Sequence, residues 1–158
     1  MSIRPVINHF GLTVRDLERS TAFYSRFGAE VIADGHFCGE RMDTGLGLRG
    51  VDRGARMSPV GGHVIEPLQS DAPEGSAYTS RNCDVGAAHI AFQVEDLPTL
   101  YAELSAAGVA FMSAPNPIED GVFAGGYWVY FKDPDGISVE LLQPGPDFTR
   151  LLGASDTQ

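Results

Sequence analysis

The order of hydrophobic and polar positions repeats once along this chain. Residues 9–17 read HFGLTVRDL, and residues 89–97 read HIAFQVEDL. Both segments begin with aromatic and branched residues that alternate with smaller or polar ones, which predicts a half-buried β-strand. Both then present an aspartate, Asp16 or Asp96, followed by apolar residues at helical spacing. Because an aspartate caps the free amide groups of a helix, each segment is expected to form a strand that leads into a helix.

Each expected helix ends at a glycine, and strand-like patterns follow it. Gly28 and Gly108 stand where a left-handed residue closes a helix. In the first copy the expected strands are residues 29–34, 40–46, 54–59 and 63–69, the middle two being poorly marked. In the second copy they are residues 109–115, 126–133 and 137–144, with the turn KDPDG before the last. The order is read as β-α-β-β-β in each copy.

The ends of the two copies also agree, because VIEPLQ at residues 64–69 resembles SVELLQ at residues 138–143. Two copies exclude a solenoid and favour paired modules with pseudo-two-fold symmetry. The expected fold class is α+β. The expected divisions are a first βαβββ module at residues 1–70, a linker at 71–85, a second module at 86–145 and a partly disordered tail at 146–158.

The bulk composition narrows the class of protein and of partner. A chain of 158 residues, 43% apolar and 20% charged, fits a globular protein of one domain or two small modules. It has no apolar run near the roughly 18 residues of a membrane span, and its first residues lack the features of a secretory signal. A cytoplasmic protein is therefore expected. A formal net charge of −10 argues against nucleic acid or an anionic membrane as partner.

Two cysteines and two of the histidines carry no pattern that indicates a site. Cys38 and Cys83 lie far apart in no metal-ligand or redox spacing, so they are expected to be unpaired thiols. His36 and His63 have no counterpart in the other copy and are expected in loops or on the surface.

Four other polar residues interrupt the apolar strands at matched positions of the two copies. His9 corresponds to His89, and Glu66 corresponds to Glu140. Burying one unpaired carboxylate is costly, and two carboxylates near each other also repel. A divalent ion held by both imidazoles and both carboxylates would offset that cost. Such a mixed N/O ligand set suits Ni, Co, Zn, Mn or Fe.

Three motifs resemble those of the vicinal oxygen chelate superfamily, which includes glyoxalase I, methylmalonyl-CoA epimerase, extradiol dioxygenases, and bleomycin and fosfomycin resistance proteins. The motifs are HFGLTVRDLERSTAFY, HIAFQVEDL and KDPDGISVELLQP, and the resemblance covers about residues 5–145. It implies a homodimer and two βαβββ modules that form a half-barrel cleft, with metal ligands on the first and last strand of each module. The matching positions are His9, Glu66, His89 and Glu140, a set similar to that of bacterial glyoxalase I.

The ligand set predicts a proton-transfer enzyme. Four protein ligands leave two positions of an octahedral ion for adjacent oxygens of a small substrate. The ion would act as a Lewis acid that stabilises an enolate when a neighbouring C–H proton is removed. A carboxylate would take and return the proton, with Glu140 as the first candidate and Glu66 as the second. The expected activity is that of a metal-dependent lyase or isomerase of the glyoxalase or epimerase type.

Departures from the family pattern leave the substrate open. Glyoxalase I holds glutathione with basic residues near the loop that precedes its penultimate strand, but that loop here, residues 119–131, contains neither Lys nor Arg. The epimerase usually has Gln where Glu66 stands. The arginine-rich segment 41–56 could meet a CoA phosphate or could be a solvated loop.

Two functions of other classes are also considered. His9, His89 and Glu140 alone would form the two-histidine, one-carboxylate set of an Fe(II)-dependent extradiol-type dioxygenase, although Glu66 as a fourth ligand counts against it. A metal-free protein that sequesters a drug or an aromatic metabolite would instead line a cleft with aromatic side chains. The candidates for that lining are Phe111, Phe123, Tyr127, Trp128 and Tyr130.

Overall fold

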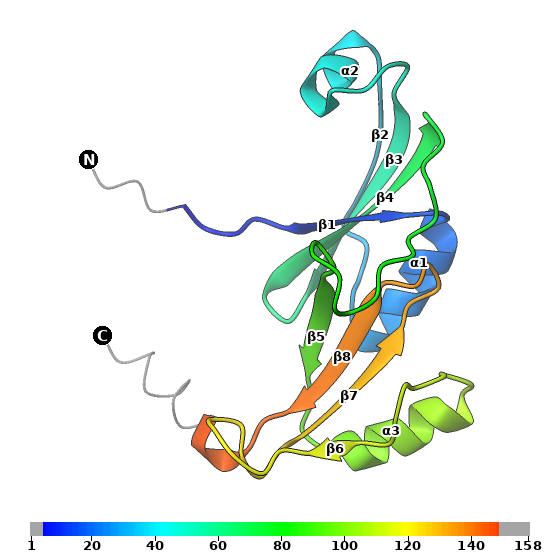
Figure 1. The fold of residues 1–158 in the computed structure, drawn as a ribbon. Helices are drawn as coiled ribbons and strands as arrows, with labels where there is room; N and C mark the ends of the chain where they lie inside the picture. The colour runs from blue at the N-terminus through cyan, green and yellow to red at the C-terminus, as the bar shows by residue number, and fades with distance from the viewer. Residues whose placement is uncertain (1–4, 149–158) are drawn as a thin grey trace. The chain divides into compact units, whose positions relative to one another are not determined.

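The computed structural model describes residues 5–148 and divides the chain into two compact units (Figure 1). The first unit ends at Tyr78 and the second begins at Thr79. Each unit contains a four-stranded mixed sheet with helices packed on it, so the α+β fold class is confirmed. None of the helices within residues 5–148 is both long enough and apolar enough to span a membrane.

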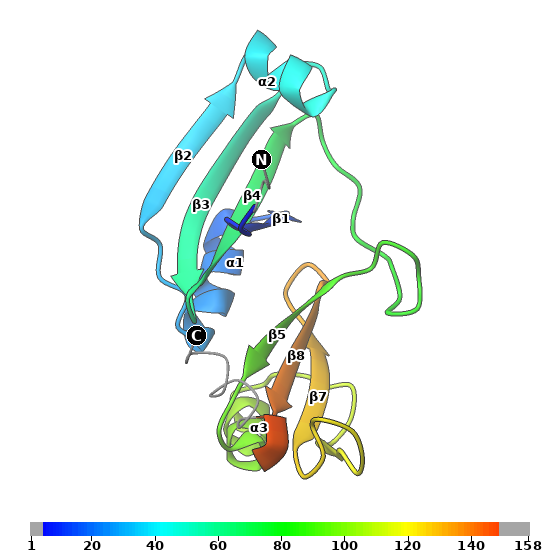
Figure 2. The same ribbon diagram turned by 90° about the vertical axis from the view of Figure 1, so that its left-hand side faces the viewer.

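The first unit is a sheet with strand order β1-β4-β3-β2 (Figure 2). Its first and last strands pair in parallel, whereas the other neighbours are antiparallel. Helix α1 packs against β3 and β4 (Figure 1). The elements are β1 (Phe10–Val14), α1 (Leu17–Tyr24), the 3₁₀ turn η1 (Ser25–Phe27), β2 (Ala33–Cys38), α2 (Glu40–Leu46), β3 (Asp52–Val60) and β4 (His63–Ala72).

The second unit repeats this topology with strand order β5-β8-β7-β6. Strands β5 and β8 pair in parallel, and α3 packs against β8 (Figure 1). The elements are β5 (His89–Gln93), α3 (Leu97–Ala106), β6 (Asn116–Pro117), β7 (Tyr127–Lys132) and β8 (Ser138–Gln143). The duplicated βαβββ arrangement that the sequence predicts is thus present in both units.

The two copies agree down to individual hydrogen bonds at the helix N-termini. Asp16 caps α1 by accepting from the Arg19 amide, and Asp96 caps α3 by accepting from the Thr99 amide. The first residue of each helix then donates its amide to a glutamine on β4 or β8. These are the strands that pair in parallel with the first strand of each unit. These bonds are Leu17 N to Gln69 Oε1 and Leu97 N to Gln143 Oε1, both 2.9 Å long. The repeated final glutamine therefore ties each helix to its sheet.

Each sheet buries one face under its helices. The buried apolar residues of the first unit are Val14, Tyr24, Ala29, Val51, Ala55, Ile65 and Pro67. Those of the second unit are Leu97, Leu104, Val129, Phe131, Ile137, Val139 and Leu141. The residues that alternate with them on β4, β5 and β8 face the other way, and Glu66, His89 and Glu140 are among these. The fourth candidate metal ligand, His9, immediately precedes β1.

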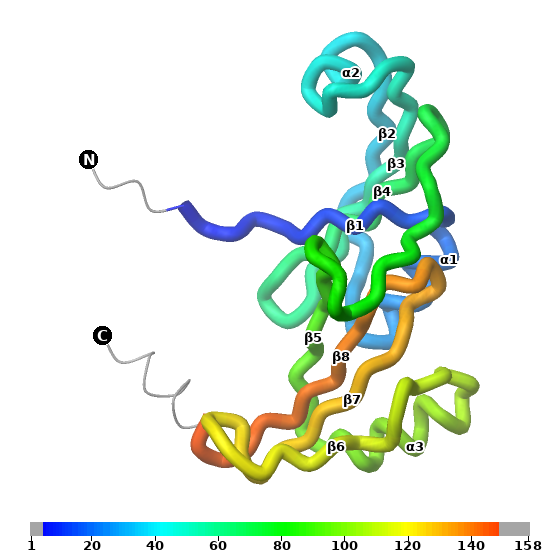
Figure 3. The backbone as a smooth tube through the Cα atoms, in the orientation of Figure 1, coloured from blue at the N-terminus to red at the C-terminus, as the bar shows by residue number. Residues whose placement is uncertain are grey.

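Three of the expected strands are corrected. Residues 40–46 form the helix α2, which lies at the end of β2 (Figures 2 and 3). The first strand after α1 is Ala33–Cys38 rather than residues 29–34. Residues 109–115 contribute only an isolated bridge between Phe111 and Phe131, and the short strand β6 follows them. The strands expected at 54–59, 63–69, 126–133 and 137–144 lie in β3, β4, β7 and β8.

The glycines and the hairpin turn behave as their sequence context predicts. Gly28 has φ of 83° and Gly108 has φ of 87°, so both adopt the left-handed conformation just after a helix. In the KDPDG turn, Asp133 Oδ1 accepts from the amides of Asp135 and Ile137. Most of the tail expected at 146–158 lies outside the described residues.

Candidate functional site

The first unit brings His9 and Glu66 together across its parallel strand pair. His9 immediately precedes β1, and Gly11 on β1 pairs with Glu66 on β4. The distance between His9 Nε2 and Glu66 Oε2 is 3.1 Å, with the side chains 38% and 20% exposed. The other ring nitrogen of His9, Nδ1, donates to Asn8 Oδ1 at 2.8 Å. That bond fixes the orientation of the ring and leaves Nε2 directed at the carboxylate.

The second unit brings His89 and Glu140 together in the same way. Ala91 on β5 pairs with Glu140 on β8, the register position that Gly11 and Glu66 occupy in the first unit. The distance between His89 Nε2 and Glu140 Oε2 is again 3.1 Å, with the side chains 46% and 14% exposed. The four residues singled out by the sequence repeat are therefore two equivalent pairs, one in each unit.

The geometry of each pair fits two ligands of one metal ion. Ligand bonds of about 2.1 Å at right angles place their donor atoms roughly 3 Å apart, and both pairs measure 3.1 Å. The chemistry also fits, because imidazole nitrogen and carboxylate oxygen together suit first-row divalent ions. That all four residues bind one shared ion stays a prediction.

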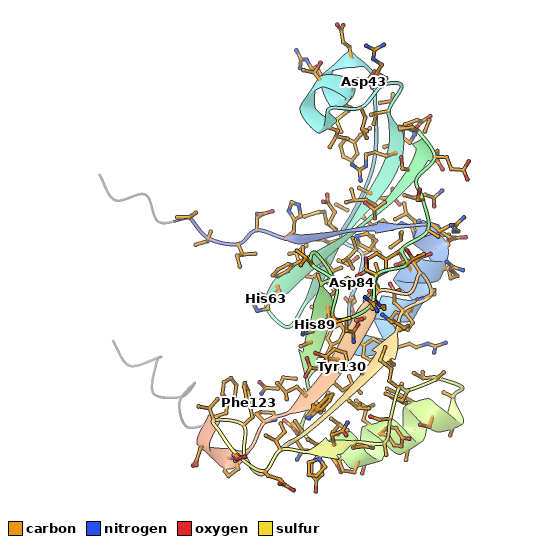
Figure 4. The ribbon with its side chains drawn as sticks, in the orientation of Figure 1. Asp43, His63, Asp84, His89, Phe123 and Tyr130 are labelled. Atoms are coloured by element: carbon orange, nitrogen blue, oxygen red, sulfur yellow. The ribbon has the colours of Figure 1, made fainter. Side chains whose placement is uncertain are left out.

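Tyr130 on β7 adds a hydrogen bond to the pair in the second unit. Its hydroxyl donates to Glu140 Oε2 at 2.7 Å and lies 3.2 Å from His89 Nε2. Strand β8 lies between β7 and β5, so Tyr130 and His89 approach Glu140 from its two neighbouring strands (Figure 4). Burial raises the pKa of the Tyr130 phenol, and the hydrogen bond to Glu140 raises it further. The phenol therefore stays protonated and remains a donor.

The residue of the first unit at the position that matches Tyr130 has no hydroxyl. Ser58 pairs with Ile65 and Ala55 with Leu68, so the residue of β3 that faces Glu66 is Met57. A methionine thioether donates no hydrogen bond. On the other side of Glu66 stands Gly11, where an added Cβ would lie 3.9 Å from Glu66 Oε2. Among the described residues, Glu66 thus has one polar side-chain partner, His9, whereas Glu140 has two, His89 and Tyr130.

A pocket of about 540 Å³ lies beside the pair in the second unit. Its volume is within the range of about 300–1,000 Å³ that is usual for small-molecule sites. The lining combines aromatic and apolar side chains with amides, hydroxyls and one imidazole. The lining residues are Asn82, Ala87, Ala88, His89, Met112, Ser113, Asn116, Trp128, Tyr130 and Ser138.

Of the aromatic residues expected to line a cleft, two line this pocket. These are Trp128 and Tyr130, whose rings pack edge-on with centroids 5.7 Å apart. Phe111 instead packs between Tyr101 and Phe131, with centroid distances of 4.7 and 5.1 Å. Phe123 packs on Phe148, and Tyr127 is not among the lining residues.

One arginine of the segment 41–56 is already engaged in hydrogen bonds and an ion pair within the first unit. Arg56 donates to Asp34 at 3.0 Å and to Thr21 at 3.1 Å, and it also forms an ion pair with Glu18. Hydrogen bonds from Arg56 to Glu18 and Asp34 raise the pKa of this arginine. A CoA phosphate would have to displace carboxylates to reach this guanidinium.

The remaining histidines and cysteines lie on the surface, as expected. Cys38 and Cys83 are free thiols and exposed. His63 is exposed at the start of β4 (Figure 4). His36 is 61% exposed on β2 rather than in a loop, with its Nε2 2.5 Å from Asp52 Oδ1. Ligand atoms of His36, Asp52 and Asp71 lie within 4.8 Å of one another, a grouping that the sequence analysis did not anticipate.

Two features of the site were not found from the sequence. Tyr130 was identified only as a candidate lining residue, and its place opposite Glu140 depends on the register of β7 and β8. Asn82 lies in the segment expected to be a linker, but it contacts Ser138 at the start of β8. An alignment of the two hairpins would have shown that Tyr130 and Met57 occupy matched positions. Nothing in the sequence indicates a role for Asn82.

Comparison with known proteins identifies a family. The model of the Glyoxalase/Bleomycin resistance protein/Dioxygenase superfamily matches residues 6–141. A 2-epi-5-epi-valiolone epimerase from Actinomyces sp. is 31% identical over 144 residues, which cover 86% of this chain and 78% of that protein.

Solved structures with the same fold agree. The glyoxalase family protein from Bacillus cereus matches with a TM-score of 0.76 at 18% identity, covering 91% of this chain and 98% of that one. The fosfomycin resistance protein FosX from Listeria monocytogenes, in complex with Mn(II) and sulfate, matches with a TM-score of 0.61 at 23% identity, covering 94% and 99%. At these identities the structural likeness shows the fold.

Proposed function

Because the chain belongs to the Glyoxalase/Bleomycin resistance protein/Dioxygenase superfamily, we propose that it is a divalent-metal-dependent enzyme that transfers a proton on a small oxygenated substrate. The observation that carries this proposal is the duplicated His–Glu pair, with the same 3.1 Å separation in both units. A single pair of this kind is a common surface ion pair. Two pairs at the same register position of a duplicated fold indicate a shared role.

His9, Glu66, His89 and Glu140 bind one divalent ion in this proposal, with Ni, Co, Zn, Mn and Fe as candidates. The ion would supply a Lewis acid that stabilises the negative charge on a substrate oxygen when a neighbouring C–H proton is removed. A substrate with two adjacent oxygens suits the ligand positions that four protein ligands leave open. The two carboxylates would balance the charge of the ion, which removes the cost of placing them together.

The proton is taken by one of the two carboxylates. Tyr130 donates to Glu140 and holds it in one orientation. Met57 and Gly11, the strand neighbours of Glu66, leave that side chain more freedom to turn toward a substrate. Glu66 is therefore favoured as the base and Glu140 as the fixed ligand, which reverses the order expected from the sequence.

Epimerisation is the favoured reaction within this class. Removal of a proton from one face of a carbon and delivery of a proton to its other face invert that centre without a redox change. The Actinomyces relative is called an epimerase and is 31% identical over most of this chain. The Mn(II) complex of FosX is consistent with a divalent ion in a protein of this fold.

Metal analysis of the purified full-length protein tests the proposal. We expect about one divalent ion per chain after dialysis without chelators, and its loss in a Glu66→Ala/Glu140→Ala variant that keeps the circular dichroism of the wild type. His63→Ala is the matched control, because His63 is exposed outside both pairs and its removal should leave the metal content unchanged. Wild type without an ion, or the double variant with one, would contradict the proposal, and the first result would favour a sequestering protein.

Proton exchange tests the reaction. The first probe is 2-epi-5-epi-valiolone, the compound in the name of the Actinomyces relative. In deuterated water, NMR should show deuterium entering one carbon of the probe together with inversion at that carbon. Oxygen consumption in the same assay with a catechol would instead indicate the dioxygenase alternative.

A further inference from the structure

The pocket beside His89 holds two amide side chains that each keep one group available. The Nδ2 group of Asn116 donates to Ser113 Oγ at 2.9 Å and to the Ala114 carbonyl at 3.2 Å. Its Oδ1 atom accepts no hydrogen bond from any residue within 5–148. Asn82 has the opposite arrangement, because its Oδ1 accepts from Ser138 Oγ and its Nδ2 has no acceptor among the described residues. The lining thus presents one fixed acceptor and one fixed donor.

A hydroxyl group can satisfy both amides. It donates one hydrogen bond and accepts others, whereas an ionised carboxylate or phosphate oxygen can only accept. An anionic group facing Asn116 Oδ1 would meet a second acceptor, which leaves both unpaired. The pocket therefore fits a ligand with several hydroxyl groups better than one with an acidic group at that position.

The charge around the pocket also favours an uncharged ligand. No arginine or lysine is among the lining residues. The chain's single lysine, Lys132, is not a lining residue, but it donates to Ser138 Oγ at 2.8 Å, with Asn82 Oδ1 3.5 Å away. Its ammonium group therefore helps to hold Ser138 and Asn82 in place. The chain as a whole carries a net charge of −10, which disfavours an anionic ligand.

The aromatic side of the pocket supplies a flat apolar surface. Trp128 is 37% exposed, and its ring is held edge-on by Tyr130. Met112, also in the lining, is 49% exposed. An indole face packs well against a flat apolar surface. The C–H face of a saturated six-membered ring is such a surface, and the hydroxyl groups around that ring point outward to polar partners.

We propose that this pocket binds the uncharged, polyhydroxylated saturated ring of the substrate, with the ring on Trp128 and its hydroxyl groups on Asn82 and Asn116. This names the substrate class of the proposed enzyme and rests on the proposed function, because His89 belongs to both the pocket and the metal pair. The ring would lie beside His89 and Tyr130, the two residues that contact Glu140, while the lining selects against acidic and plain apolar compounds.

Trp128 makes the proposal directly measurable. It is the only tryptophan of the chain, so the intrinsic fluorescence reports on this pocket. The full-length protein would be titrated with myo-inositol, with myo-inositol 1-phosphate and with cyclohexanol. We expect a saturable fluorescence change with myo-inositol, at a Kd at least about tenfold lower than with the other two compounds, because each of those lacks or misplaces a polar partner. Equal or tighter binding of the phosphate or of cyclohexanol would overturn the proposal, as would no saturable change with myo-inositol.

Two variants test whether the contact with Asn116, rather than the integrity of the fold, determines binding. Asn116→Leu should weaken myo-inositol binding about tenfold or more, with circular dichroism and metal content unchanged. Gln93→Leu removes an exposed amide from β5 outside the lining and should leave binding unchanged. Equal affinity in Asn116→Leu and wild type would contradict the assigned contact.

The same titration distinguishes failure of this inference from failure of the proposed function. Metal bound at about one ion per chain with no myo-inositol binding would overturn the substrate class alone. Binding of myo-inositol by a protein that holds no metal under any condition would support the pocket and overturn the metal-dependent enzyme.

Discussion

The His–Glu pair of the first unit and that of the second have the same separation and the same strand register, but their neighbours differ. Glu140 lies between Ala91 and Tyr130 and accepts a hydrogen bond from the tyrosine. Glu66 lies between Gly11 and Met57, neither of which has a side-chain donor. The two units thus share the His–Glu pair, while the residues around it differ. The difference teaches that equivalent glutamates of a duplicated fold can have different surroundings, since only Glu140 accepts a tyrosine hydrogen bond.

Removing the charge of each glutamate in turn should have the largest effect and should separate the roles proposed for the two. Glu66→Gln should lower solvent deuterium exchange into the substrate by about 10²- to 10⁴-fold, the usual contribution of a general base, while retaining some metal. Glu140→Gln should lower metal affinity first, with exchange recovering at high metal concentration. Exchange and metal binding by isothermal calorimetry measure the two effects. If Glu140→Gln abolishes exchange at saturating metal and Glu66→Gln does not, the roles are reversed.

A core substitution in the second unit should have the next largest effect. Leu141 on β8 is fully buried, so Leu141→Ala should cost about 2–5 kcal/mol of unfolding free energy. Its neighbour Leu142 is only half-buried, and Leu142→Ala should cost less. Urea unfolding followed by Trp128 fluorescence reports this unit. Equal costs for the two variants would show that β8 is not the buried centre of its sheet.

Removing the hydroxyl of Tyr130 should have a smaller effect, on the second pair alone. Tyr130→Phe removes the hydrogen bond to Glu140 and should weaken metal binding by about 10- to 100-fold, as loss of a partner that orients a ligand does. Met57→Leu changes the matched position of the first unit with little change of volume and should leave affinity unchanged. Competition with a coloured chelator gives both affinities. A Tyr130→Phe protein with wild-type affinity would remove the distinction between the pairs.

The smallest predicted effect concerns α2, which has no counterpart between the strands described for the second unit. The Val51 amide and then the Gly50 amide donate to Asp43 and lower the pKa of its carboxyl below the ordinary 3.8 (Figure 4). The stabilisation is therefore full above pH 3.8 and is lost as the pH falls through the lower pKa of the folded state. Asp43→Asn should flatten the fall of thermal midpoint between about pH 4 and pH 2. Glu40→Gln on the same helix is the control, and an unchanged slope in Asp43→Asn would contradict this contribution.

Much of the fold and of the candidate site could be predicted from the sequence because local signals agreed with the repeat. Asp16 and Asp96 mark both helix starts, and the alternation around His89 and Glu140 gives the strand faces seen in the structure. The symmetry of the repeat then identified both pairs, although it did not reveal their surroundings. Tyr130 reaches Glu140 through the pairing of β7 with β8, and pairing is a property of two segments rather than of one.

Helix α2 was missed for a different reason. The segment ERMDTGL contains a threonine and a glycine, which are poor helix formers, and it has no side chain that caps its start. It is held instead by its ends: Gly47 closes it with φ of 66°, and Asp43 accepts from the amides of Gly50 and Val51. Because those contacts involve the following loop, the spacing of residues within the helix does not indicate them. Single-segment patterns cannot detect a helix that is stabilised in this way.

The parallel pairing of β1 with β4, and of β5 with β8, has a consequence for how the site is assembled. Each histidine adjoins or starts the first strand of its unit, and each glutamate lies on the strand that closes the sheet against it. During synthesis, the histidine of each unit therefore has no glutamate to pair with until almost the entire unit has been made. Contacts so distant in sequence form late in folding. Binding of an ion to either pair would therefore stabilise a completely synthesised unit but not an incomplete one.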